Sequence, residues 1–222
     1  DIAPDEPGSM ENVYGLFKMA APALYPLDNP VDYEPDISQC LGAKAGAAGV
    51  DPIDYLYDFL LEDGGTRFAS LSAVDLPARM GVLQEMLLHP DTVTGLSDAG
   101  AHVTLICDGS MPTTQLAYWT RDREKGEKIP IEFIVRKQTA LNAQLYGFDD
   151  RGTLEMGKKA DINVIDMDNL RVSPPVPHHD LPTGGTRLMQ PVTGYINTLC
   201  NGTSAREFDQ DTGERPGRLV RS

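Results

Sequence analysis

Basic side chains are scarce in this sequence. Its 222 residues carry 19 Lys and Arg against 33 Asp and Glu, which gives a formal net charge of −14. Nucleic acids and anionic membrane surfaces bind proteins through surplus Lys and Arg. The charge therefore argues against both kinds of partner.

Long apolar runs and a secretory leader are also missing. No apolar run approaches the roughly 20 residues that a membrane-spanning helix needs. The first residues, 1–8, lack the basic and apolar regions of a signal peptide. They are loop-like, and the chain begins with Asp1 instead of Met. We therefore expect a soluble, cytoplasmic protein and interpret the chain as a piece of a longer one.

Cysteine is rare and widely spaced. Cys40, Cys107 and Cys200 form no C-x-x-C pair, so the sequence favours neither a disulfide framework nor a thiolate zinc cluster, and we expect buried free thiols. What is present is an ordinary globular composition, with 41% hydrophobic and 23% charged residues. The chain can therefore form a real core.

Apolar spacing and helix-terminating residues predict an α-rich first part. Residues 1–36 are rich in proline and leave room for one short helix, at about residues 10–20. Further helices are predicted at about 38–48, 52–62, 77–88, 113–125 and 131–146. A β-rich run at 92–96 leads into a polar loop. Helix, turn, strand and loop in succession indicate a parallel α/β architecture.

The pattern of residues changes after Gly147, where glycines separate short runs with the composition of strands. Strands are predicted at 160–167, 194–200 and 203–208. Asn201-Gly202 is a turn pair preferred in two-residue hairpins. Asn201 also begins a glycosylation pattern, but without a secretory signal the turn is the better explanation.

Asp98 is the strongest candidate for chemistry, because it follows the predicted strand at 92–96. Catalytic groups in barrels and open parallel sheets gather at the carboxyl ends of strands. A carboxylate there can hold a divalent metal, take a proton from water and later protonate a leaving amine. The alternative is that Asp98 only caps the next element.

Other polar residues near Asp98 carry weaker signals. His102 could donate a hydrogen bond to a substrate or satisfy a backbone group. Asp108 is more typical of a turn than of a catalyst. Ser97, Asp98 and His102 supply the residue types of a hydrolytic triad, but no G-x-S-x-G elbow surrounds the serine. We therefore reject a serine hydrolase.

Three other features have structural explanations. Adjacent side chains of an extended segment point in opposite directions, so His178 and His179 rarely share one metal ion, and a surface loop explains 178–180 better. His89 is predicted to cap a helix end. Trp119 is predicted to pack a helix against a sheet.

Six segments carry a shared sequence pattern: residues 89–102, 107–112, 118–123, 149–166, 179–187 and 215–220. Together they resemble the amidohydrolase superfamily, and within it the N-acyl-D-amino-acid deacylase group. The resemblance extends over nearly the whole chain from about Val50 onward. Segment 149–166 is similar to the superfamily's return into its small β domain.

The resemblance implies a metal-dependent (β/α)8 barrel with zinc at the carboxyl ends of its strands. The family's water-activating Asp, which also binds the metal, corresponds to Asp98, and this favours catalysis over capping. In related cyclic amidases a His shortly after that Asp touches the substrate, and His102 holds that position.

The family's other metal ligands, including its His-x-His pair, lie upstream of what this chain contains. A full barrel needs about 250 residues, far more than the 147 that precede the β-rich part of this chain. We therefore interpret residues 1–147 as the C-terminal part of the barrel and 148–222 as a small β-sandwich domain, both incomplete. We expect that this chain alone holds no zinc.

The resulting hypothesis is a C-terminal portion of an enzyme that hydrolyses the amide bond of N-acyl-(D-)amino acids, inactive in isolation. One alternative is a non-catalytic fragment or subunit that docks on the missing N-terminal half or on another copy of the chain. A second alternative is a hydrolase of cyclic amides such as hydantoins or dihydropyrimidines.

Overall fold

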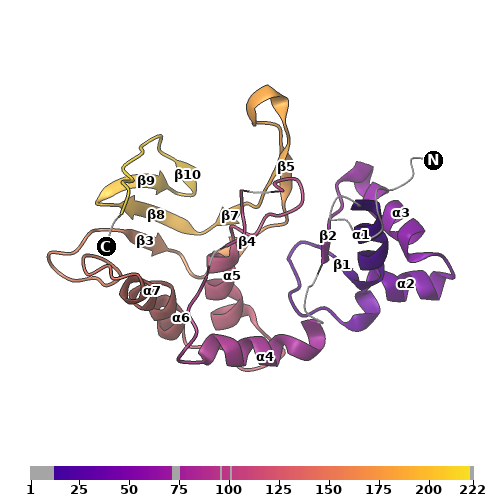
Figure 1. Ribbon diagram of the computed structural model, residues 1–222, viewed down its shortest axis with the longest axis horizontal. Coiled ribbons are helices and arrows are strands. Elements are labelled where there is room, and N and C mark those ends of the chain that lie inside the picture. Colours follow the sequence, from indigo (N-terminus) through magenta and orange to yellow (C-terminus); the bar gives the residue numbers. More distant parts are fainter. Residues whose placement is uncertain (1–12, 72–75, 96, 101, 221–222) are drawn as a thin grey trace. The chain divides into compact units, whose positions relative to one another are not determined.

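The computed structural model describes residues 13–71, 76–95, 97–100 and 102–220 (Figure 1). The chain forms two compact units, Asp1–Gln84 and Glu85–Ser222. The sequence change after Gly147 therefore lies inside the second unit and does not coincide with this division. The assignment of 1–147 and 148–222 to two parts of a larger fold stays a prediction. The loop predicted at 1–8 lies outside the described residues.

The first unit consists of short helices and a two-stranded antiparallel sheet. Its elements are α1 (Val13–Ala20), η1 (Ala21–Ala23), β1 (Leu24–Pro26), η2 (Ile37–Gln39), α2 (Leu41–Ala48), α3 (Pro52–Gly65) and β2 (Ala69–Leu71). The next helix is α4 (Leu76–Leu88). The helices predicted at 38–48, 52–62 and 77–88 are confirmed, as is the described part of the one at 10–20.

Local signals explain where the helices of the first unit begin and end. The Asp51 carboxylate accepts a hydrogen bond from the Ile53 N–H at 2.9 Å, which satisfies a free donor at the start of α3. Gly49 adopts a left-handed conformation, φ 70°, and ends α2. Regular helical geometry in α3 stops at Glu62.

The core of the first unit lies between α2, α3 and the η1–β1 segment. Its buried members are Ala21, Leu24, Leu41, Leu56 and Phe59. The Cys40 thiol is buried, as expected, and donates to the carbonyl of Pro22 at 2.6 Å. This core is small but continuous.

The second unit combines helices with three antiparallel sheets. Its helical segments are α5 (Met111–Ala117), the π-helical turn η3 (Tyr118–Asp122), α6 (Ile131–Gln138), α7 (Ala140–Leu145) and η4 (Pro182–Gly184). Its strands are β3 (Ile162–Ile165), β4 (Arg171–Val172), β5 (Val176–His178), β6 (Arg187–Met189), β7 (Val192–Thr193), β8 (Tyr195–Cys200), β9 (Thr203–Glu207) and β10 (Gln210–Asp211).

The largest sheet has the order β10-β9-β8-β3, and the two-stranded sheet β4–β7 and the hairpin β5–β6 are separate from it (Figure 1). Asn201 and Gly202 join β8 to β9 with φ values of 50° and 80°. Two positive φ values match the twist of a tight hairpin. The three strands predicted after Gly147 and the turn between the last two are therefore confirmed as β3, β8 and β9.

Two predictions about the middle of the chain are wrong. Residues 92–95 form no strand, since their backbone is paired with no strand of the described residues, and the Thr94 side chain binds a helix: its hydroxyl donates to the Lys137 carbonyl at 3.4 Å. Residue 96, the last of that predicted strand, lies outside the described residues. The helix predicted at 131–146 is broken at Thr139, whose ψ of −83° is not helical.

All strand pairs within the described residues are antiparallel. The parallel rhythm expected from the sequence is therefore not seen in this part of the chain. The architecture is mixed α/β, with no barrel visible among the described residues. The β-sandwich stays a prediction.

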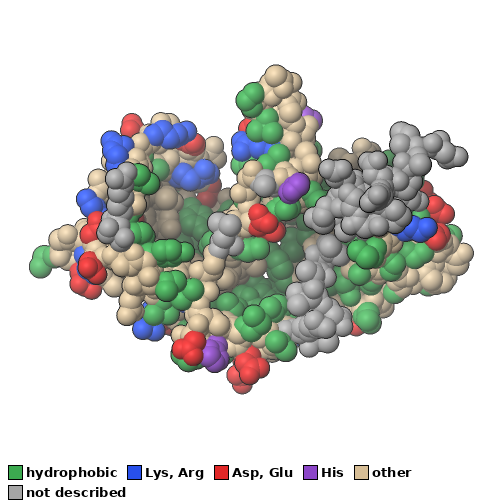
Figure 2. All heavy atoms as spheres, in the orientation of Figure 1, with side chains coloured by type: hydrophobic (Ala, Val, Ile, Leu, Met, Phe, Trp, Pro, Cys, Tyr) green, Lys and Arg blue, Asp and Glu red, His purple; other side chains and the backbone are tan. Residues whose placement is uncertain are grey.

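Large apolar side chains remain exposed in both units, and many are visible in Figure 2. In the second unit they include Met86, Leu88, Val93, Leu105 and Val135. No helix in the described part of the chain is long and apolar enough to cross a membrane. These side chains expose more apolar surface to solvent than a soluble monomeric domain normally does.

Candidate functional site

Asp98 lies exposed in the polar loop of residues 97–110. Its backbone carbonyl accepts a hydrogen bond from the Asp108 N–H at 3.0 Å, which joins the two ends of the loop. Its carboxylate has no hydrogen-bond partner among the described residues, so the helix-cap contact is not seen there. An exposed carboxylate without a partner is available to a substrate or an ion.

His102 is exposed in the same loop, at the start of a tight turn. Its carbonyl accepts hydrogen bonds from the Leu105 N–H at 2.7 Å and the Ile106 N–H at 2.9 Å. Its φ of 47° is left-handed, a conformation that His adopts more readily than most residues. The structure therefore places His102 and Asp98 in one loop, as the sequence predicts.

Strand β6 and the residue after it bind this loop, although they lie far from it in the sequence. The Leu188 N–H donates to the Val103 carbonyl at 2.8 Å. The Ser110 hydroxyl donates to the side-chain oxygen of Gln190, whose backbone N–H bonds the Cys107 thiol. The sequence reasoning missed Gln190, and its local pattern carries no signal for this role.

Two carboxylates act on each other within the loop. Partial burial raises the pKa of the Asp108 carboxyl, and the negative charge of Asp98 raises it further. Burial also raises the pKa of the Cys107 thiol, Asp108 adds to that effect, and the Gln190 hydrogen bond opposes it. Cys107 is thus a neutral, half-buried thiol beside an acidic pair.

Lys137 is the largest side chain that the structure buries completely, with 1% of its surface exposed. Its ammonium group donates to the carbonyls of Leu87 and His89 and to the hydroxyl of Thr92. These groups lie at the end of α4 and in the turn before Asp98. The sequence reasoning missed Lys137, although its position one helical turn after the buried Ile134 places it on the core-facing side of α6.

The histidine pair of the β5–β6 hairpin is exposed, but only His179 lies in the predicted loop, because His178 ends β5 and pairs with Arg187 of β6. The Nδ1 atom of His179 lies 2.8 Å from the Thr186 hydroxyl. Arg187 donates two hydrogen bonds of 2.7 Å to Asp180, and these bonds lower the pKa of that carboxyl. No group of three or more metal-binding side chains occurs in the part of the chain that the structure describes.

The helix cap expected of His89 and the helix-to-sheet packing expected of Trp119 stay predictions. The Nδ1 atom of His89 accepts a hydrogen bond from the Asp91 N–H at 3.2 Å, in the turn that ends α4. Trp119 is buried; its ring centroid lies 5.5 Å from that of Tyr118 in an edge-to-face arrangement and 4.7 Å from the Arg123 guanidinium carbon.

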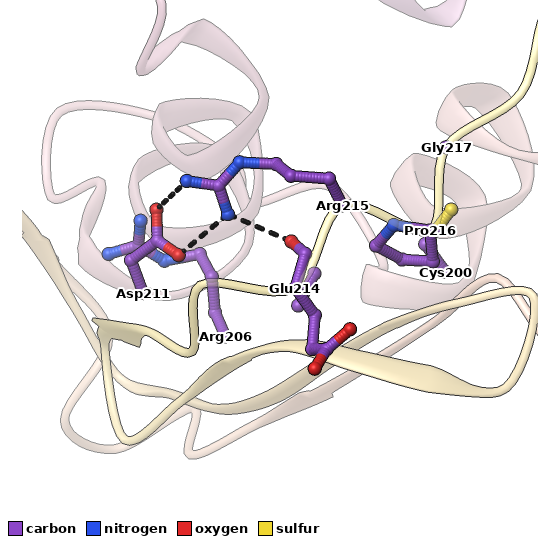
Figure 3. Close-up of a pocket in the computed structure, with 8 residues that line it drawn as sticks. Cys200, Arg206, Asp211, Glu214, Arg215, Pro216 and Gly217 are labelled. Atoms are coloured by element: carbon purple, nitrogen blue, oxygen red, sulfur yellow. Dashed lines mark hydrogen bonds and ion pairs between the residues drawn. The ribbon is translucent and has the colours of Figure 1, made fainter.

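An open depression of about 420 Å³ lies beside the β8–β9 hairpin (Figure 3). Arg215 crosses it and forms an ion pair of 2.9 Å with Asp211, while Cys200 and Pro216 line its other end. Its charged groups thus neutralise one another. None of the 97–110 loop residues lines it, and we place the candidate site at that loop.

Comparison with known sequences identifies the family. Residues 43–205 match the sequence profile described as the amidohydrolase family. This stretch is more than half of the 222 residues. The chain belongs to the amidohydrolase family.

Two individual proteins that match this chain share 30% or less of the aligned residues with it. A 5-methylthioadenosine/S-adenosylhomocysteine deaminase of Haloarcula marismortui is 29% identical over 186 residues, which is 78% of this chain and 39% of the deaminase. An uncharacterized protein of Mycobacterium tuberculosis is 30% identical over 136 residues, 60% of this chain and 22% of that protein. No solved structure matches the chain.

The amidohydrolase match includes the loop of Asp98 and His102 and the whole of α6. The chain covers well under half the length of these two relatives. Amidohydrolases are generally metal-dependent, and a catalytic zinc usually has three protein ligands. The described residues offer no such set and do not by themselves fit a complete metal site.

Proposed function

We propose that this chain is the C-terminal portion of an amidohydrolase that cleaves the amide bond of N-acyl-(D-)amino acids. Asp98 is its general base and metal-binding carboxylate, and His102 contacts the substrate. The observation that carries the proposal is that an amidohydrolase match spanning residues 43–205 contains a loop with an exposed Asp98 whose carboxylate binds none of the described residues.

Asp98 can supply both proton transfers that amide hydrolysis needs. Its carboxylate oxygen takes a proton from the attacking water and then gives it to the nitrogen of the leaving amine. The second transfer matters because an amide nitrogen leaves poorly as an anion. His102 can donate a hydrogen bond from its ring to an oxygen of the substrate.

The remaining parts of the site belong to residues outside this chain. The relatives are much longer, and the described residues lack a three-ligand set for a metal ion. The exposed apolar side chains of the second unit also support a larger assembly. We therefore expect no turnover by the 222-residue chain alone.

The test compares this chain with a longer protein that contains it and the sequence encoded upstream of Asp1. Both are assayed with added zinc against N-acyl-D-amino acids, N-acyl-L-amino acids, a hydantoin and an aminopurine nucleoside. We expect only the longer protein to act, with the N-acyl-D-amino acids as its best substrates. Turnover by the shorter chain would contradict the proposal that the site is incomplete.

The first prediction concerns Asp98. In the longer protein, Asp98→Asn removes the proton acceptor and should lower kcat by about 100-fold or more with N-acyl substrates. Asp91→Asn is the matched control, because Asp91 is an exposed carboxylate of the preceding turn. Equal activity of the two variants would exclude Asp98 as the base, and preference for the nucleoside would replace the deacylase assignment with a deaminase.

A further inference from the structure

We propose that Lys137 is a positioning residue for Asp98. Its buried ammonium group fixes the end of α4 and the turn that leads into the 97–110 loop. The proposal relies on the proposed function only for the role of Asp98, because the contacts of Lys137 are independent of any substrate or metal.

The three N–H donors of the ammonium group have three acceptors. They are the carbonyl of Leu87, the carbonyl of His89 at 3.2 Å and the hydroxyl of Thr92 at 2.7 Å. The ring of Phe133 lies 5.6 Å from the nitrogen and adds a cation–π contact. The side chain therefore joins α6 to the end of α4 and to the following turn.

All hydrogen-bond acceptors of Lys137 in the described residues are neutral, so no carboxylate balances its charge. The last carbonyls of α4 form the negative end of the helix dipole, which favours a cation there. Burial nevertheless lowers the pKa of the ammonium group. Since an apolar side chain would fill the same space at less cost, packing alone does not explain a lysine here.

A second attachment follows directly along the chain. The Thr94 hydroxyl donates to the Lys137 carbonyl at 3.4 Å and accepts a hydrogen bond of 2.7 Å from Asn142. On the other side of Asp98, its carbonyl binds the Asp108 N–H. The chain is thus attached to α6 and α7 before Asp98, through Thr94, and Asp98 itself is bonded to Asp108 of its own loop.

The test is amide hydrogen exchange on the 222-residue chain with the variant Lys137→Met. Two amides report the position of the segment: Thr92, bonded to the His89 carbonyl at 3.3 Å, and Asp108, bonded to the Asp98 carbonyl at 3.0 Å. Both should exchange about tenfold faster, the effect of losing one net hydrogen bond. The Phe208 amide, bonded to Ile196 within the large sheet, should keep its rate.

Lys159→Met is the matched control, because Lys159 is exposed, and it should change none of the three amides. Thr92→Val removes one acceptor of Lys137, together with the hydroxyl's own hydrogen bonds to the Met86 and His89 carbonyls, and should accelerate Asp108 exchange to a smaller extent. This variant decides the matter if Lys137→Met fails to fold.

Unchanged exchange at Asp108 in Lys137→Met would overturn the proposal. Equal acceleration at Phe208 would also overturn it, because the lysine would then stabilise the unit as a whole without positioning Asp98. The measurement needs neither substrate nor metal, so its outcome is separate from that of the Asp98→Asn assay.

Discussion

For single residues, the burial of Asp108 and the charge of nearby Asp98 affect how the stability of the fold changes with pH. The pKa of Asp108 lies above its ordinary value of 3.8, mainly through burial and then through Asp98. The folded chain therefore binds this proton more tightly than the unfolded chain does. It follows that ionised Asp108 lowers the stability of the fold at neutral pH, and that the penalty is lost below pH 3.8.

Asp108→Asn should therefore raise the free energy of unfolding at about pH 7, by at most about 0.5 kcal/mol, because the group is exposed. The gain should shrink as the pH is lowered toward 3.8, where the wild-type carboxyl becomes protonated. Urea unfolding at several pH values measures both effects. Asp91→Asn is the control, and a gain in Asp108→Asn that grows at lower pH would contradict the assigned direction.

Sequence reasoning located Asp98 and His102 in one loop, because the family motif spans both residues. It could not find Lys137 or Gln190 as parts of the same region. Lys137 acts on carbonyls some fifty residues earlier in the chain, and Gln190 bonds Ser110 from eighty residues away. Such contacts depend on how the elements pack, which no local pattern records.

At the scale of elements, the close packing of α2 on the η1 segment depends on Gly42. A Cβ atom at this position would lie 2.4 Å from the carbonyl oxygen of Pro22 and 2.8 Å from its Cα atom. Both neighbours are backbone atoms, so neither can move aside cheaply. The helix can approach η1 only because this side chain is a hydrogen atom.

Gly42→Ala should therefore destabilise the first unit by about 1–3 kcal/mol, the usual cost of overpacking. Gly46→Ala in the same helix is the matched control, because no atom lies within 4 Å of its Cβ position. It should stabilise α2 by up to about 1 kcal/mol through helix propensity. Chemical denaturation followed by circular dichroism measures both, and equal effects would refute the close contact.

The helices were more predictable than the strands for a related reason. Caps such as Asp51 and Gly49 act within a few residues, so the sequence locates them. Residues 92–95 have the composition of a strand, but a strand also needs a neighbour to pair with. In the described structure Thr94 instead bonds residues of α6 and α7, and no strand forms.

For the molecule as a whole, two features occur together: the chain matches the amidohydrolase family, and many of its large apolar side chains are exposed to solvent. Exposed large apolar side chains outnumber the buried ones in the described residues. The relatives extend well beyond the region that this chain matches. Both observations support the proposal that another polypeptide segment, or a second copy of the chain, covers this surface.

We therefore expect the purified chain to associate or to bind a hydrophobic dye strongly. Light scattering over a range of concentrations should give masses above the monomer's 24.2 kDa. The longer protein should bind less dye per residue, because its additional segments cover the apolar side chains. A monodisperse monomer with little dye binding would contradict the idea that the surface is an interface.

The ends of most helices, the Asn201-Gly202 hairpin and the amidohydrolase family can be predicted from the order of the residues alone. These features depend on neighbouring residues or on patterns that survive in the chain's order. The folded chain was needed to show that Thr94 binds α6 and α7, that Lys137 is buried at the end of α4, and that Gln190 binds the loop of Asp98. Each of these depends on contacts between distant residues, whose energies exist only once the chain has folded.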